Sequence, residues 1–172
     1  CGMKVHKIST NYKPEHKDHK YEFKNADPTE PSQILGLTWA ISSDSFNIIV
    51  PIPPEGMTKR DLLAHINSIY DPLGMFSPII NTGKMIFQKI WQYQCDWNSK
   101  IPELLYKEWQ LWKSNIECMS SITFPRKIKV TKNSRIVMFS DAAETGLASC
   151  AYLVTGEESW LIMSKVRVAP VK

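Results

Sequence analysis

The stretch RIVMFSDAAETGLASCAYLVTGEESWLIMSK, residues 135–165, decides the fold, because apolar runs alternate in it with short turns. The runs cover residues 135–140, 147–154 and 160–165. Runs of this length between turn residues predict three antiparallel strands. The middle run is apolar along most of its length, which is typical of a central strand. Such a sheet cannot cover both of its faces, so we expect either the upstream helices to cover it or the domain to continue past Lys172.

Three helices are predicted upstream of these strands. The first begins at Thr58, which forms a capping-box pattern with Asp61. The second begins at Ser77-Pro78, after a break at residues 71–74, and the third begins at Pro102. Each helix carries one apolar stripe at helical spacing. The stripes are Leu62, Ile66, Ile69 and Leu73; Ile79, Gly83, Ile86 or Phe87, and Ile90; and Leu105, Trp109, Trp112 and Ile116.

The region before the helices predicts a hairpin and a polar lead-in. Residues 34–39 and 46–50 have strand character and flank a turn cluster at residues 42–45. Residues 1–33 are rich in Lys, His and Pro, so we expect a flexible lead-in there. The predicted fold class is therefore α+β: a β-hairpin, a helical segment and three antiparallel strands.

Composition narrows the classes of function. The 172 residues carry a formal net charge of +4, which permits a nucleic-acid partner without requiring one. No run of 18 apolar residues exists, so no membrane span is expected. The four cysteines form no C-x-x-C pair, so neither a zinc site nor a redox motif is predicted. The start at Cys1 is not a natural initiator, which predicts a piece of a longer chain.

Asp141 is the residue most informative about chemistry. It follows an apolar strand and precedes Ala142 and Ala143, so its carboxylate is held beside a backbone that a large substrate can approach. Metal-dependent phosphodiester cleavage uses several such acids to hold divalent ions. The alternative, which the spacing leaves open, is an aspartate that caps a turn.

Several motifs resemble the Pol polyprotein of BEL/Pao-type LTR retrotransposons. They include Ile69-Tyr70-Asp71-Pro72-Leu73-Gly74 followed by Ser77-Pro78, and Phe139-Ser140-Asp141-Ala142-Ala143. They also include Ser164-Lys165-Val166-Arg167-Val168-Ala169-Pro170, and the weaker runs at 34–39 and 58–63. The resemblance covers residues 34–172.

The resemblance implies a domain order. Residues 34–133 are expected to hold the end of the reverse-transcriptase palm, at 34–50, then the thumb and the connection. Residues 134–172 are expected to form the first three strands of a truncated ribonuclease H-like domain. Asp141 then matches the first metal-binding acid, with Mg²⁺ or Mn²⁺ as the ion. The polymerase Asp-Asp motif is absent and the next nuclease glutamate would follow Lys172, so we expect no activity from this chain alone.

The resemblance also implies partners. An RNA–DNA hybrid or primer–template and the remaining Pol domains are expected, with no membrane. Lys59, Arg60 and His65 on the first helix are candidate nucleic-acid contacts, as are Lys127 and Lys129, which lie in a basic stretch with Lys132 and Arg135. The alternative for the first group is an ordinary solvated face, and the alternative for the second is a stretch that keeps an edge strand soluble. The implied location is cytoplasmic, in a virus-like particle if the element is active.

Two other functions stay open. One is a domesticated, non-enzymatic interaction domain. The other is an aspartic peptidase, because a peptidase label is attached to this family. Aspartic peptidases need two aspartates that share a proton, in Asp-Thr-Gly or Asp-Ser-Gly motifs. Asp141-Ala142-Ala143 lacks both the hydroxyl and the glycine, so the peptidase is the less favoured of the two.

Overall fold

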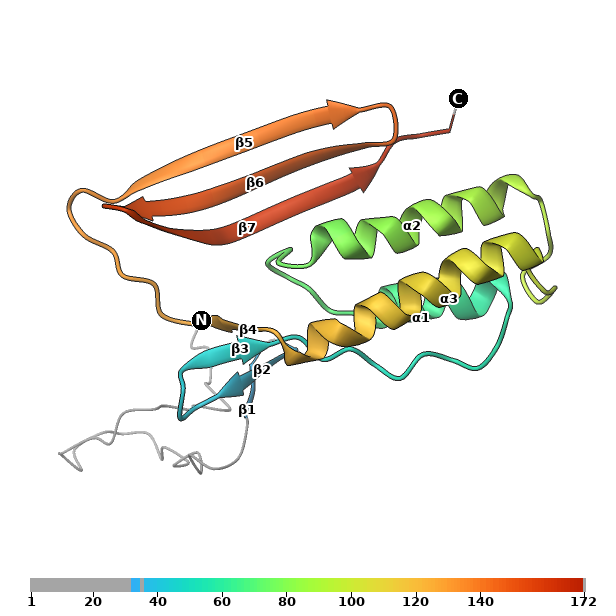
Figure 1. Ribbon diagram of the computed structural model, residues 1–172, viewed down its shortest axis with the longest axis horizontal. Helices are drawn as coiled ribbons and strands as arrows, with labels where there is room; N and C mark the ends of the chain where they lie inside the picture. Colours follow the sequence, from blue (N-terminus) through green and yellow to red (C-terminus); the bar gives the residue numbers. More distant parts are fainter. Residues whose placement is uncertain (1–31, 35, 172) are drawn as a thin grey trace, which may run out of the picture. The chain divides into compact units, whose positions relative to one another are not determined.

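The computed structural model describes residues 32–34 and 36–171, which form helices and two antiparallel sheets (Figure 1). The fold class is α+β, as the sequence predicts. The chain divides into two compact units. In the described range, the first holds residues 32–47 and 123–127, and the second holds residues 48–122 and 128–171. The predicted lead-in lies outside the described residues, except that residues 32 and 33 belong to a strand.

The first unit is a small four-stranded sheet. It consists of β1 (Ser32–Ile34), β2 (Leu37–Ala40), β3 (Ser45–Asn47) and β4 (Thr123–Pro125), in that order. The prediction of one strand over residues 34–39 is wrong, because Gly36 adopts a φ of 79° and turns the chain between β1 and β2. The second predicted strand is also too long, since β3 ends at Asn47.

The helices of the second unit begin where the sequence predicts. They are α1 (Lys59–Ser68), α2 (Ser77–Gln92) and α3 (Glu103–Glu117), followed by a short 3₁₀ helix, η1 (Cys118–Ser121). Thr58 and Asp61 form the capping box at α1. Leu105, Trp109, Trp112 and Ile116 are all buried, which confirms the stripe of α3. On α2, Ile80 rather than Ile79 is buried.

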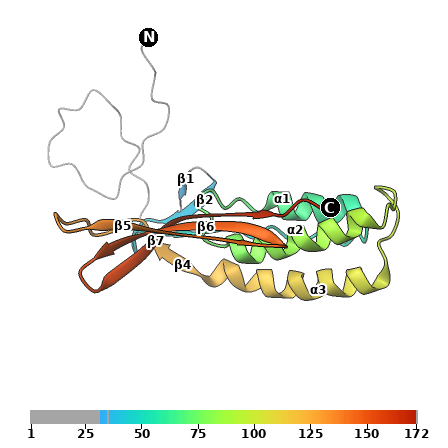
Figure 2. The ribbon, with the colours of Figure 1, turned by 90° about the horizontal axis from the view of Figure 1, so that it is seen from above.

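Helix α2 is the centre of this unit. It contacts α1, α3 and the strand β7 (Glu158–Val168), and Figure 2 shows it between the other two helices. Gly83 permits the close packing with α3, because a Cβ there would lie only 2.5 Å from the Trp112 ring. The Trp112 indole also donates to the Ile79 carbonyl oxygen at 2.8 Å. The helical core is therefore tightly packed.

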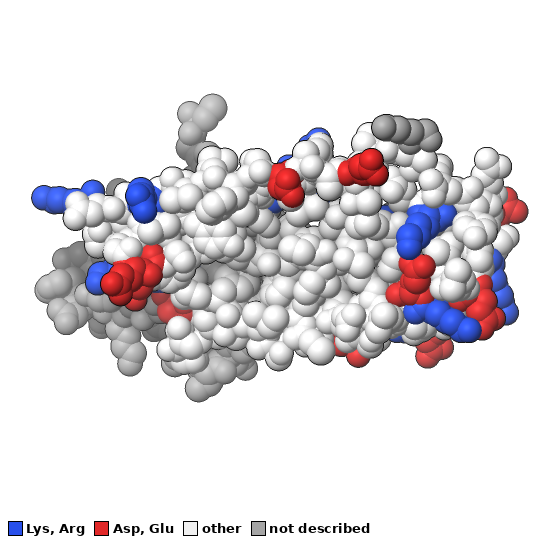
Figure 3. All heavy atoms as spheres, turned by 45° about the horizontal axis from the view of Figure 1, so that its top comes forward, with Lys and Arg blue, Asp and Glu red and all other residues white. Residues whose placement is uncertain are grey.

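The predicted three strands form the second sheet. They are β5 (Arg135–Ala143), β6 (Gly146–Thr155) and β7, all antiparallel, with β6 in the middle. All their residues fall in the described range, and none of them is buried. Figure 3 shows a broad surface over the middle of this sheet without charged side chains. The sheet is therefore much more open than the helical core.

The loop before α2 ties the helices to β7. The Asp71 carboxylate accepts hydrogen bonds from the backbone N–H groups of Met75 and Phe76, at 2.9 and 2.8 Å. Ser164 of β7 donates from its backbone N–H to the Leu73 carbonyl at 2.8 Å, and from its hydroxyl to the Gly74 carbonyl. The two most distinctive motifs of the sequence thus contact each other.

Candidate functional site

Asp141 lies on β5, the edge strand of the open sheet. The prediction that the strand ends at Asp141 is wrong, because β5 continues through Ala143. Asp141 pairs with Ala148 of β6, whose methyl group leaves space around the carboxylate. The side chain is exposed, and it forms no side-chain hydrogen bond or ion pair with any residue that the structure describes. A turn-capping role for Asp141 is therefore not observed.

A groove of about 470 Å³ runs along one face of the sheet and includes Asp141. Phe139, Cys150 and Tyr152 line it from β5 and β6, Met75 lines it from the loop before α2, and Pro78 lines it from the first turn of α2. The lining is mostly apolar. A carboxylate at the border of such a groove is a hard oxygen donor that suits Mg²⁺ or Mn²⁺.

Asp141 by itself is one ligand and not a metal site. Among residues 32–34 and 36–171, no group of three or more His, Cys, Asp or Glu side chains is placed to hold an ion. Glu144, which lies near Asp141 in sequence, lines neither this groove nor a second, more open hollow that also includes Asp141. The carboxylate oxygen of Asp141 is a suitable ligand for Mg²⁺ or Mn²⁺, but the described residues supply too few such ligands at this position to hold the ion.

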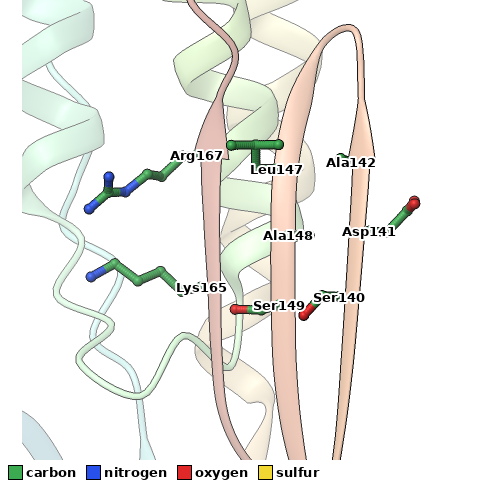
Figure 4. A pocket seen from close by; sticks show the side chains of 8 residues that line it. All are labelled: Ser140, Asp141, Ala142, Leu147, Ala148, Ser149, Lys165 and Arg167. Atoms are coloured by element: carbon green, nitrogen blue, oxygen red, sulfur yellow. The ribbon is translucent and has the colours of Figure 1, made fainter.

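Two basic side chains lie on the other face of the same sheet. Lys165 and Arg167 of β7 line an open hollow of about 670 Å³ together with Ser140 and Ser149. Figure 4 shows both basic side chains pointing to one side and Asp141 pointing to the opposite side. The register explains this, because alternate residues of a strand face opposite ways. Lys165 and Arg167 were not among the candidate site residues predicted from the sequence. Their two-residue spacing along a strand was the signal that both side chains share one face.

Lys59 is buried, although the sequence predicts it on the polar side of α1. Its side chain is only 4% exposed, and its ammonium donates to the Cys95 carbonyl at 3.2 Å. The same ammonium lies 4.0 Å from the centroid of the Trp91 ring and 5.3 Å from that of Trp97. The prediction of a solvated position is therefore wrong, and Lys59 instead holds two aromatic rings.

Arg60, the next residue, is exposed as predicted. Its Nε donates to the side-chain oxygen of Asn98 at 3.0 Å. Its guanidinium carbon lies 5.9 Å from the centroid of the Trp97 ring. Neither terminal guanidinium nitrogen has a partner among the described residues. Of the three candidate contacts on α1, Arg60 alone presents its charge to solvent.

His65 is also buried, with 2% of its surface exposed, so its predicted place on the polar face is wrong. Its ring packs edge-on against Trp112 at a centroid distance of 5.5 Å. Neither ring nitrogen has a hydrogen-bond partner in the described part of the chain. Burial lowers the pKa of His65 below its ordinary value. A neutral His65 is thus part of the core.

Lys127 and Lys129 are exposed, as are Lys132 and Arg135. Lys127 belongs to the first unit and Lys129 to the second. None of the five basic candidates lines either of the hollows that contain Asp141. The structure therefore does not bring the predicted contacts and Asp141 into one cluster.

The open antiparallel sheet carries an acid on its first strand, and α2 packs against its third. The sequence model of the Pao retrotransposon-like RNaseH-like domain matches residues 58–172, and the chain belongs to this family. The match begins at the cap of α1, so it includes the helices assigned above to the thumb and connection. No curated protein and no solved structure gave a significant match. None of the helices in the described range is long and apolar enough to cross a membrane.

Proposed function

We propose that this chain is the part of a retrotransposon Pol polyprotein in which the reverse transcriptase meets the ribonuclease H domain. Its role is to bind an RNA–DNA hybrid or a primer–template, next to further Pol domains. Membership in an RNaseH-like family supports this proposal, and the mild positive charge is compatible with it.

The observation that carries the proposal is the state of Asp141. An exposed carboxylate without a cation partner in the described chain borders a groove, on the strand that the family resemblance assigns to the first nuclease acid. Its oxygens have no protein cation among the described residues, so they remain available as ligands. Asp141 is therefore free to ligate Mg²⁺ or Mn²⁺ once other acids complete the site. The ion would neutralise charge and activate water for phosphodiester cleavage.

The experiment is a pair of measurements on the purified chain. Binding of a fluorescent blunt RNA–DNA hybrid is followed by anisotropy at several salt concentrations, and cleavage of the same hybrid is followed with Mg²⁺. We expect binding that weakens with salt, because phosphate contacts release counterions, and no cleavage, because one acid does not complete a two-ion catalytic site. Absence of hybrid binding at low salt would reject the proposed function, and robust cleavage would reject the incomplete site.

One observation favours a second candidate, a non-enzymatic interaction domain. The face in Figure 3 shows no charged side chain over the middle of the open sheet. On the strands of this sheet, Ile136, Met138 and Met163 are each more than half exposed. Exposed apolar patches often mark protein interfaces. The hybrid-binding measurement separates the two candidate functions. A nucleic-acid-binding fragment is expected to bind the hybrid, and a protein-interaction domain is not.

A further inference from the structure

The aromatic side chains around Lys59 form a second exposed feature, distant in sequence from Asp141. Trp91 is 53% exposed and Trp97 is 39% exposed, although both rings pack against Phe87 at centroid distances of 6.3 and 6.4 Å. Tryptophan carries a large apolar surface, so two half-exposed indoles side by side are a notable loss of burial. We call Arg60, Trp91 and Trp97 the tryptophan corner.

The corner is held rigidly. The two indoles meet edge to face, with centroids 5.7 Å apart and planes at 69°. Lys59 lies under both rings and is fixed by the Cys95 carbonyl. In addition, the backbone N–H of Arg60 donates to the Trp97 carbonyl at 3.1 Å. The rings therefore lose little conformational freedom when a ligand binds, which favours recognition.

The geometry of Lys59 leaves one face of Trp91 for a partner. Lys59 is buried and lies over one face of this ring, so the exposed part of the indole comes from its other face and its edges. The ammonium draws π-electron density toward itself, and the outer face is left electron-poor. Such a face suits stacking by an electron-rich purine base. The Trp97 ring, which meets the Trp91 ring edge to face, would lie beside the stacked base.

Charge at the corner selects an anionic partner. Lys59 and Arg60 form no ion pair with an acid among the described residues. Arg60 uses its Nε for Asn98 and keeps its terminal N–H groups for an outside acceptor. A guanidinium binds phosphate oxygens through two parallel hydrogen bonds. An aromatic face next to an unpaired arginine is the combination that binds single-stranded nucleic acid.

We propose that the tryptophan corner binds an unpaired purine nucleotide of a nucleic-acid strand, with the base stacked on Trp91 and its phosphate on Arg60. This inference rests on the proposed nucleic-acid function. It adds a second binding site to that function, and this site recognises unpaired nucleotides. A duplex offers no free base face, so the corner discriminates single-stranded from paired regions.

The test compares three variants of the full chain on two probes, a short oligoriboadenylate and a blunt RNA–DNA hybrid. Trp91→Leu should weaken oligoriboadenylate binding by about 5- to 150-fold, the range expected for one lost stacking contact. Trp91→Phe should give a smaller loss. Tyr70→Leu is the matched control, because Tyr70 is an exposed aromatic (51%) outside the corner, and it should change neither affinity. Urea unfolding of each variant confirms that it is folded.

The outcomes separate the corner from the proposed function. Hybrid binding that is unchanged in Trp91→Leu, together with the loss on the oligoriboadenylate, supports the corner. Equal affinity of wild type and Trp91→Leu for the oligoriboadenylate overturns it, and then the exposed indoles belong to a protein interface. If wild type binds the oligoriboadenylate in a Trp91-dependent way but not the hybrid, the corner stands and hybrid binding alone fails.

Discussion

At the scale of single residues, the unusual feature is a lysine that works as a structural group. Lys59 is surrounded by Trp91, Trp97 and the Cys95 carbonyl, and its methylene stem is buried with its ammonium. Its immediate neighbour Arg60 is exposed. The two residues therefore form a natural pair for comparison.

Lys59→Ala should destabilise the chain, and Arg60→Ala should not. The first change removes a charge-assisted hydrogen bond, a desolvated cation–π contact and buried methylenes, so we expect a loss of about 1–3 kcal/mol in the free energy of unfolding. The second removes only exposed contacts, with an expected change below about 0.5 kcal/mol. Urea unfolding measures both. Equal effects would show that Lys59 is not a core residue.

His65 should make stability depend on pH. Burial lowers its folded-state pKa, and on α3 the Lys113 charge adds to this shift while the Glu117 charge opposes it. The unfolded chain therefore binds a proton more readily than the folded chain. Stability is complete above the unfolded pKa of about 6.5 and falls as the pH drops toward the folded pKa.

The corresponding measurement is urea unfolding of wild type and His65→Phe between about pH 7.5 and pH 5.5. The phenyl ring fills similar space and cannot take a proton, so the variant should lose the His65 share of the pH dependence. Its stability near neutral pH should equal or exceed that of wild type, because the unsatisfied ring nitrogens are removed. Identical pH profiles would contradict a buried neutral His65.

At the scale of elements, the loop at residues 71–76 connects the helices to the open sheet. Gly74 adopts a φ of 72°, and a Cβ at this position would collide with the Ser164 carbonyl of β7. Gly156, in the turn between β6 and β7, has a φ of 63° with nothing within 4 Å. The two glycines share a backbone conformation and differ in their surroundings.

Gly74→Ala should therefore be much more destabilising than Gly156→Ala. The matched change at Gly156 carries only the backbone cost of about 1 kcal/mol. At Gly74 the collision with β7 adds to this cost, and we expect at least about 2 kcal/mol more. Thermal or urea unfolding of the two variants measures the difference. Similar losses would mean that the loop does not pack against β7.

Local sequence patterns predicted the helices and strands better than the contacts between them. The stripe of α3 was found because Trp109 and Trp112 repeat at helical spacing, and the capping box at Thr58 because its signal spans only four residues. The strand β4 was missed, because three residues carry no period and their pairing with β3 is non-local. The contact of Ser164 with Gly74 joins residues 90 apart, which no local pattern reveals.

For the candidate site, too, the sequence was informative about local features and uninformative about contacts with distant residues. Asp141 was singled out because it follows an apolar run; it is exposed, and its role as a metal ligand stays a prediction. Lys59 and His65 were placed on the wrong side of α1, because a charged or polar residue is normally solvated. The aromatic rings that surround Lys59 lie more than 30 residues further along the chain, so its burial followed only from the tertiary structure.

At the scale of the whole molecule, the chain divides into two compact units. The predicted boundary at residues 133/134 falls inside the second unit, where α2 and β7 are in contact. The family match spans the same helices and strands. The helices and the open sheet therefore belong to one structural unit, and their assignment to a thumb and a connection stays a prediction.

The central claim is that Asp141 offers its carboxylate to a divalent cation. The direct measurement is Mn²⁺-induced broadening of backbone amide signals in NMR spectra of wild type, Asp141→Asn and the control Glu144→Gln. A single carboxylate contacts Mn²⁺ only weakly and transiently, and such contact is enough to broaden nearby signals. We predict broadening at Ala142 and at Ala148, the β6 partner of Asp141, in wild type and in the control, and none in Asp141→Asn. Equal broadening in all three proteins, or its loss only in Glu144→Gln, would contradict the account.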